Sequence, residues 1–310
     1  MTLFKRLSLV IFLAITFLNQ GCETPNNRPP KHIIIIGIDG LSVEGFKTAN
    51  IPNLKGLAND GALSLTTRSV MPSVTLPNWT SHLTGSGPEQ HGVNGNGWLL
   101  EQHPLEPTAQ DSLGYYPSIF KVLKEQVKDI QIGYYYNWGN LINAINKTYL
   151  DEISFLDNDG YLENYNKALT FAIKNKNNPS LIFLYAVNVD HAGHKSGWLS
   201  EDYINTLEDL DAAIGSLLTS LKNEGLYDST NFFVITDHGG INHGHGGMSP
   251  EEMIIPWIAT GPSIKKNFII EEPNSNTNTS MVLSRIFSCD NYLPKAWIGK
   301  VPESIFENQH

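Results

Sequence analysis

The segment HIIIIGID, residues 32–39, decides the fold class. Its β-branched side chains follow one another without polar interruption, which is typical of a strand buried on both faces in the middle of a parallel sheet. Further strands are expected at residues 131–136, 180–187, 231–236 and 254–260. Helices are expected at residues 52–60, 117–127, 161–174 and 202–223. This alternation predicts an α/β sandwich with a central, largely parallel sheet flanked by helices.

Length and charge narrow the function classes. The chain has 310 residues, of which 41% are apolar and 17% charged, as in an ordinary globular protein. Its formal net charge of -10 and lack of a Lys/Arg cluster argue against binding a nucleic-acid duplex, where phosphate contacts dominate affinity. A small anionic substrate remains compatible with this charge if metal cations at the site invert the local field.

The first residues read as an export signal. Lys5 and Arg6 precede an apolar run over residues 7–18, and Gly21-Cys22 resembles a bacterial lipoprotein cleavage site. We therefore predict a signal peptide at 1–21, a lipid on Cys22, a flexible tether over 22–31 and one folded domain over 32–310. The expected location is the bacterial cell envelope, periplasmic or cell-surface. A simple secretory signal or an uncleaved anchor is the alternative.

Carboxylates and histidines follow three of the expected strands. Asp39, Asp190 and Asp237 each lie at or just beyond a strand end, where ligands collect in parallel sheets. Asp190-x-x-x-His194 and Asp237-His238 are expected in glycine-containing loops. The full candidate ligand set is Asp39, Asp190, His194, Asp237, His238, His243 and His245. Mixed carboxylate and imidazole ligands favour zinc, although each residue alone is more simply a helix cap or an exposed side chain.

Thr75 is the candidate nucleophile. Pro77 suits a first helical turn, so a short helix over about 77–83 places Thr75 beside its N-terminus. The helix dipole and free N–H groups there stabilise an alkoxide, and a bound metal lowers the hydroxyl pKa. A threonine in this position is otherwise a helix cap.

Several stretches together resemble the nucleotide pyrophosphatase/phosphodiesterase branch of the alkaline-phosphatase superfamily. They are IIGIDG, SVTLPNWTSHLTGSGPEQHGVNGN, NVDHAGHKSG, TDHGG and HGHGG, and the resemblance spans about residues 32–262. It implies an alkaline-phosphatase-like catalytic domain with two Zn²⁺. One zinc would be held by Asp39, Thr75, Asp237 and His238, and the other by Asp190, His194 and His245. Asn96 falls where that branch places an Asn that hydrogen-bonds a non-bridging phosphate oxygen.

The resemblance implies a metal-dependent hydrolase of phosphodiesters or nucleotide pyrophosphates that forms a covalent phospho-threonine intermediate. Two alternatives stay open: a phosphomonoesterase or a phosphoethanolamine-type transferase. His245 follows His238 by only seven residues, which is more similar to the compact transferases, and the choice between His243 and His245 is open, with the following Gly-Gly favouring His245. A non-catalytic surface lipoprotein is a remote further alternative. A sulfatase is disfavoured because no formylglycine precursor occupies position 75.

Charge and aromatic content bear on the substrate. Arginine is scarce, which favours a diester over a monoester dianion, with Arg68 and Lys195 as the residues that could reverse this preference. Four aromatic residues either line a substrate pocket or belong to the core, the core being the simpler expectation. They are Trp79, Trp98, Tyr115 and Tyr116.

Overall fold

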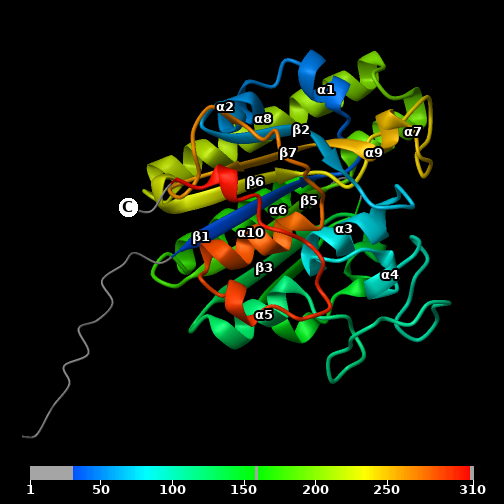
Figure 1. The fold of residues 1–310 in the computed structure, drawn as a ribbon. Coiled ribbons are helices and arrows are strands. Elements are labelled where there is room, and N and C mark those ends of the chain that lie inside the picture. Colours follow the sequence, from blue (N-terminus) through cyan, green and yellow to red (C-terminus); the bar gives the residue numbers. More distant parts are fainter. Residues whose placement is uncertain (1–30, 158–159, 308–310) are drawn as a thin grey trace, which may run out of the picture.

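The computed structural model describes residues 31–157 and 160–307. It is an α/β sandwich built on one eight-stranded sheet (Figure 1). The strands are β1 (His32–Ile38), β2 (Gly61–Arg68), β3 (Gln131–Tyr136), β4 (Glu152–Phe155), β5 (Ser180–Ala186), β6 (Thr230–Ile235), β7 (Ile254–Thr260) and β8 (Phe268–Ile269). The α-helices are α1 (Val43–Thr48), α2 (Pro52–Asn59), α3 (Thr75–Thr84), α4 (Pro88–His91), α5 (Ile119–Gln126), α6 (Tyr161–Lys174), α7 (Asn188–Ser196), α8 (Glu201–Asn223), α9 (Pro250–Met253) and α10 (Asn278–Ile286).

The strand order is β4-β3-β5-β1-β6-β7-β2-β8, with β1 in the middle. β1 pairs in parallel with both β5 and β6, and β3 and β4 continue the parallel part. β7 runs antiparallel to β6, and β2 antiparallel to β7. The predicted largely parallel sheet is therefore confirmed. The three adjacent strands β5, β1 and β6 end at the same edge, and this edge carries the candidate site.

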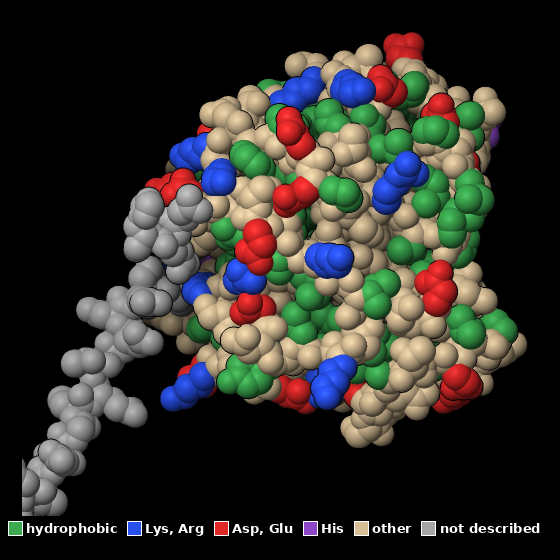
Figure 2. All heavy atoms as spheres, viewed as in Figure 1, with side chains coloured by type: hydrophobic (Ala, Val, Ile, Leu, Met, Phe, Trp, Pro, Cys, Tyr) green, Lys and Arg blue, Asp and Glu red, His purple; other side chains and the backbone are tan. Residues whose placement is uncertain are grey.

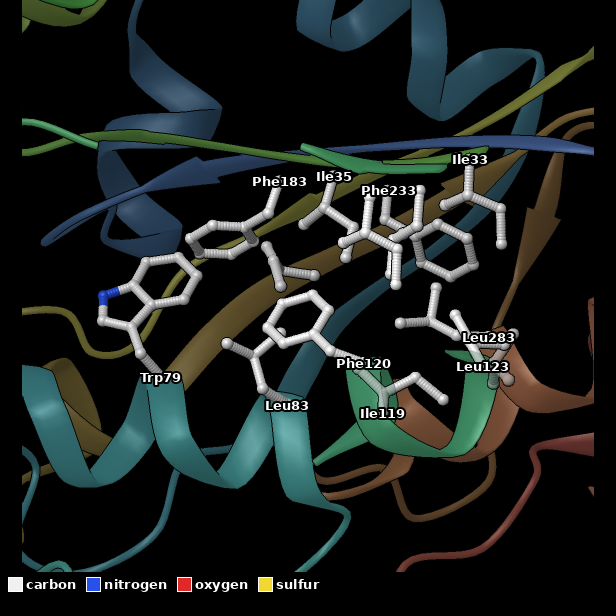
Figure 3. Packing of buried hydrophobic residues seen from close by; sticks show 14 of the residues in the cluster. Ile33, Ile35, Trp79, Leu83, Ile119, Phe120, Leu123, Phe183, Phe233 and Leu283 are labelled. Atoms are coloured by element: carbon white, nitrogen blue, oxygen red, sulfur yellow. The ribbon is translucent and has the colours of Figure 1, made fainter. Parts of the chain in front are cut away.

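Alternate isoleucines of β1 supply both layers of the core. Ile33 and Ile35 pack with α3, α5 and α10, whereas Ile34 and Ile36 pack with helices that include α2, α6 and α8. Figure 3 shows the first layer, with Trp79 and Leu83 of α3 reaching toward the sheet. Each such isoleucine is at most 3% exposed, and its burial stabilises the fold by about 1.5–3 kcal/mol. A strand buried on both faces must be apolar at every position, as residues 33–36 are.

The predicted elements correspond closely to the observed ones, with two corrections. The loop expected around Asp190 and His194 is wrong, because these residues lie on helix α7. The helix expected from Pro77 begins at Thr75, two residues earlier. Local glycine content suggested a loop at Gly193, but packing of Val189 and Ala192 into the second core layer favours a helix there.

The predicted signal peptide and the lipidation site Cys22 lie outside the described residues, as does the tether except for Lys31. Within residues 31–157 and 160–307, the helices are all too short or too polar to span a bilayer. On the face shown in Figure 2, basic and acidic side chains are interspersed.

Candidate metal centre and nucleophile

The candidate ligands converge because three neighbouring strands end together. Asp39 directly follows β1, and its backbone N–H donates to the carbonyl of Ala186 at the end of β5. Asp237 and His238 follow β6, and Asp190 lies in the first turn of α7, just beyond β5. These side chains, far apart in the sequence, therefore share one edge of the sheet.

One ligand group joins α7 to the loop after β6. Asp190 and His194 are four residues apart on one helical face, and Asp190 Oδ2 lies 3.5 Å from His194 Nε2. His245 Nε2 lies 3.1 Å from His194 Nε2 and 3.6 Å from Asp190 Oδ1. The ligand atoms of Asp190, His194 and His245 all lie within 4.8 Å of one another, a spacing that one cation can bridge.

A second ligand group lies deeper. One ligand atom each from Asp39, Asp190 and His238 again lies within 4.8 Å of the others, so Asp190 belongs to both groups. His238 Nε2 is 3.5 Å from Asp39 Oδ1 and 3.1 Å from Asp237 Oδ2. All four of these side chains are buried.

Divalent cations fit these groups. Among the described residues, three buried carboxylate oxygens lack a hydrogen-bond partner: Asp39 Oδ1, Asp190 Oδ1 and Asp237 Oδ2. Leaving buried carboxylate oxygens unpaired is costly unless a metal or donor satisfies them. The three unpaired oxygens face histidine nitrogens, and mixed oxygen and nitrogen donors suit zinc.

The histidine rings are oriented by the backbone. In each of the three histidines of the two ligand groups, Nδ1 is paired with a main-chain carbonyl: His194 with His243 O (2.9 Å), His238 with Gly239 O (2.8 Å) and His245 with Ser73 O (2.9 Å). Such pairing places the proton on Nδ1 and leaves Nε2 as the lone-pair donor. His243 likewise pairs its Nδ1 with a main-chain carbonyl, that of His194, at 3.2 Å, so this pairing does not distinguish it from His245. Of the two alternatives left open by the sequence, the described ligand groups include His245 and not His243.

The concentration of negative charge in the site shifts the pKa values of its acidic residues and of His238. Burial, followed by repulsion from Asp237 and Asp190, raises the pKa of Asp39 well above its ordinary value. Burial opposes ionisation of Asp237 as well, but His238 lowers the pKa of this carboxyl. In return, Asp237 raises the pKa of His238 against the opposing effect of burial. A cation between these groups would relieve the repulsion felt by Asp39.

Thr75 occupies the first position of α3, and the N-cap is Val74. The simple alternative of Thr75 as the N-cap residue is therefore wrong. Its Oγ1 lies 3.5 Å from His238 Nε2 and 3.4 Å from Asn96 Nδ2. Asn96 is itself held in place, since its Oδ1 accepts the backbone N–H of Leu76 at 2.8 Å. The structure thus brings both predicted catalytic residues to the second ligand group.

A family profile described as Type I phosphodiesterase / nucleotide pyrophosphatase matches residues 33–252. The chain belongs to this family. Ectonucleotide pyrophosphatase/phosphodiesterase family member 3 of Rattus norvegicus is 27% identical over 226 residues, covering 70% of this chain and 26% of the relative. Bis(5'-adenosyl)-triphosphatase ENPP4 of Bos taurus is 27% identical over 252 residues, covering 75% and 53%. The chain thus spans about a quarter to a half of these relatives.

Solved structures agree on the fold. Murine ENPP5, in an inactive threonine-to-alanine form in complex with AMP, superposes with a TM-score of 0.72 at 15% identity, covering 90% of this chain and 100% of that one. The predicted alkaline-phosphatase-like fold and its phosphodiesterase branch are therefore confirmed.

In this member of the family, the two ligand groups border a pocket of about 240 Å³. Its lining consists of Asp39, Thr75, Asn96, Trp138, Val187, Asp190, His191, His194 and His245. No Lys or Arg of the described chain is in this lining. Lys195 instead pairs with Asp202 at 3.1 Å and lines a neighbouring pocket of about 310 Å³. Arg68 ends β2 and lies outside both linings.

The aromatic residue of the pocket is one that the sequence reasoning missed. Trp138 follows β3 at the same sheet edge as the ligands, and this position after a strand was the available signal. Trp79, Trp98 and Tyr116 are at most 5% exposed and belong to hydrophobic clusters. For these three, the expectation of a core role is confirmed. Tyr115 is half-buried and outside the pocket lining.

Proposed function

We propose that this protein hydrolyses phosphodiesters or nucleotide pyrophosphates with two divalent cations, most simply Zn²⁺, and with Thr75 as nucleophile. The observation that carries the proposal is the position of Thr75 Oγ1, 3.5 Å from His238 Nε2 at the N-terminus of α3 and inside the pocket bordered by both ligand groups. Membership of the type I phosphodiesterase family supports the reaction class.

The proposed ligands divide between the two cations. Asp39, Asp237, His238 and Thr75 would hold one, whereas Asp190, His194 and His245 would hold the other. When bound, such cations lower the pKa of a coordinated hydroxyl and neutralise charge on phosphate oxygens. The unpaired oxygens of Asp39, Asp190 and Asp237 support this assignment.

The chain's own groups would then carry out an in-line displacement. The Thr75 oxygen attacks phosphorus, the bond to the leaving oxygen breaks, and a phospho-threonine forms. The N-terminus of α3 favours negative charge at this position. Asn96, fixed through Leu76 N, directs its Nδ2 donor toward a non-bridging phosphate oxygen. Attack of water on the phospho-threonine releases the product and restores Thr75.

The lining of the pocket favours a diester over a monoester. A monoester dianion carries more charge than a diester, and Arg or Lys commonly compensates for it. The described pocket lining offers neither residue. Similarity to ENPP4, named as a bis(5'-adenosyl)-triphosphatase, and to murine ENPP5 in complex with AMP supports nucleotide substrates.

A direct test compares three substrates with zinc-loaded protein lacking residues 1–30. They are bis-p-nitrophenyl phosphate, p-nitrophenyl phosphate and the p-nitrophenyl ester of thymidine 5'-monophosphate. We expect preference for the two diesters, with the thymidine ester fastest, and loss of turnover in Thr75→Ala. A preference for the monoester would instead make the protein a phosphatase. Undiminished activity in Thr75→Ala would remove the nucleophile assignment, and no turnover by any variant would favour the non-catalytic alternative.

We further propose that the mature protein is anchored in the cell envelope by a lipid on Cys22. The basic, apolar and Gly-Cys succession of residues 1–22 supports this location. The full-length protein should partition into the detergent phase after expression in a bacterium, whereas Cys22→Ser should shift it to the aqueous phase or leave the signal uncleaved. Unchanged processing and partition in Cys22→Ser would exclude the lipid.

A further inference from the structure

Tyr185, the penultimate residue of β5, contacts a candidate metal ligand from inside the core. Its hydroxyl donates a hydrogen bond to Asp39 Oδ2, and its side chain is 1% exposed. Tyr185 is opposite Gly37 in the β1–β5 register, so it lies on the same face as Asp39, which is two residues beyond Gly37 and directly follows β1. The bond occupies one oxygen of Asp39. The other, Oδ1, lies 3.5 Å from His238 Nε2 and has no hydrogen-bond partner among the described residues.

The ring of Tyr185 packs against α3, the helix that carries Thr75. Trp79 of α3 packs edge-on against it, with ring centroids 5.4 Å apart and an interplanar angle of 82°. Gly37 permits this packing, because a Cβ at that position would approach the Trp79 ring to 2.8 Å. Trp79 is one helical turn from Thr75. Tyr185 therefore connects the helix that carries the nucleophile with the carboxylate at the end of β1.

We propose that Tyr185 is a positioning residue for metal binding, which holds Asp39 in the rotamer that presents Oδ1 to the cation nearest Thr75. This inference rests on the proposed function. The phenolic hydroxyl of a tyrosine carries its proton at neutral pH, so Tyr185 acts as the donor to Asp39 Oδ2. A donor behind a ligating carboxylate restricts its rotation and so strengthens metal binding.

The chain contains a matched control. Tyr134 on the neighbouring strand β3 is 0% exposed and belongs to the same core layer as Tyr185. Its hydroxyl has no hydrogen-bond partner within the described chain. Removal of either hydroxyl deletes one oxygen from the same core layer, but only Tyr185→Phe releases a carboxylate. Differences between Tyr185→Phe and Tyr134→Phe therefore report the hydrogen bond rather than core packing.

The experiment titrates zinc into the metal-free proteins in competition with a chromophoric chelator. We expect the native protein and Tyr134→Phe to bind two equivalents with the same affinities. In Tyr185→Phe, one equivalent should bind about 10- to 100-fold more weakly. Turnover should then require more zinc and approach the native kcat as zinc rises. Equal zinc affinities in the two variants would overturn the inference.

Two further results separate the inference from the proposed function. If the native protein binds zinc and turns over diesters but Tyr185→Phe matches it, only the role of Tyr185 fails. If the native protein binds no zinc, the proposed function fails first. Circular dichroism of each metal-free variant identifies any loss of folding. If Tyr185→Phe fails to fold, Trp79→Phe replaces it, because this change loosens the packing around the Tyr185 ring and leaves the hydroxyl that bonds Asp39 in place. Trp79→Phe should weaken the same equivalent to a smaller extent, and an unchanged affinity would count against the inference.

Discussion

The two ends of helix α3 lie in buried polar surroundings that differ in how completely their hydrogen bonds are made. Near its N-terminus, Thr75 lines a pocket together with Asp39 and Asp190, each of which has a buried carboxylate oxygen without a hydrogen-bond partner. Near its C-terminus, His82 belongs to a closed chain: Trp257 Nε1 donates to Thr279 Oγ1 (3.0 Å), Thr279 donates to His82 Nδ1 (2.8 Å), and His82 Nε2 donates to Thr236 O (2.9 Å). The donors and acceptors along this chain are mutually satisfied.

This difference indicates that the region around His82 has a structural role and that the region around Thr75 binds a ligand. A satisfied buried network contributes to the specific packing of the core and needs no ligand. Unpaired buried carboxylate oxygens instead mark a place where a cation is needed. Thr236 joins the two regions, because its Oγ1 also donates to His238 O at 3.2 Å. The closed network thus holds the segment that presents Asp237 and His238.

Thr75→Ala should produce the largest effect, because it removes the attacking oxygen. We expect kcat/KM for the thymidine ester to fall by on the order of 10⁴-fold or more, with little change in melting temperature. Thr84→Ala is the matched control on the same helix, since Thr84 Oγ1 donates a hydrogen bond to the carbonyl of Thr80, one turn earlier, at 2.7 Å. Comparable losses in both variants would show that the helix, and not the Thr75 oxygen, limits turnover.

Removal of metal should affect the site at the N-terminus of α3 and leave the hydrogen-bonded chain around His82 unchanged. Zinc at about 1,000 times its dissociation constant should stabilise the native protein by about 4 kcal/mol relative to the metal-free form. Chelation should abolish turnover, and added zinc should restore it. This value applies to each bound cation, so His245→Ala should lose most of the contribution of the cation held with Asp190 and His194, while His243→Ala, outside the ligand groups, should retain it. Thermal unfolding with and without zinc measures both, and the reverse ranking of these histidines would reassign the ligand.

The closed network should respond to acid instead. Burial lowers the pKa of His82 to about 4, below the value of 6.5 expected when the chain is unfolded. Between these two pKa values His82 is protonated in the unfolded state but not in the folded state, so the free energy of unfolding falls as pH drops below about 7. From pH 7 to pH 5 this amounts to about 2 kcal/mol.

The measurement for His82 is urea unfolding of metal-free protein at both pH values. His82→Gln should unfold more easily at pH 7 but lose less stability on acidification than the native protein does. An identical loss in both proteins would mean that His82 is protonated in the folded state.

Lys195→Met should have the smallest effect. Lys195 pairs with Asp202 at an exposed position and lines the neighbouring pocket rather than the one that contains Thr75. Exposed ion pairs contribute little to stability, and we expect kcat/KM on diesters to stay within a factor of about two. A clear loss confined to the monoester or to longer substrates would place Lys195 in substrate binding and would weaken the preference for diesters.

The sequence by itself determined the elements with strong local patterns. The apolar run of β1 has to be buried on both faces, and the residues after β1 and β6 were predicted as candidate ligands from their position at strand ends. The family motifs also predicted Thr75 as the candidate nucleophile, Asn96 as its neighbour in the site and His245 as a candidate ligand. The sequence did not predict that Asp190 and His194 lie on a helix. Packing of Val189 and Ala192 stabilises α7, whereas its glycine-containing local sequence does not favour a helix.

Only the tertiary structure decided which of these groups meet. Asp39 and Asp237 are 198 residues apart, and their proximity follows from the pairing of β1 with β6. The same holds for Tyr185 behind Asp39, which has no local signature of its role, and for Trp138 in the pocket, whose one local signal is its position after β3. Hydrophobic periodicity reports which face of an element is buried, whereas the unpaired oxygens and the hydrogen bonds around them depend on contacts between elements distant in the chain.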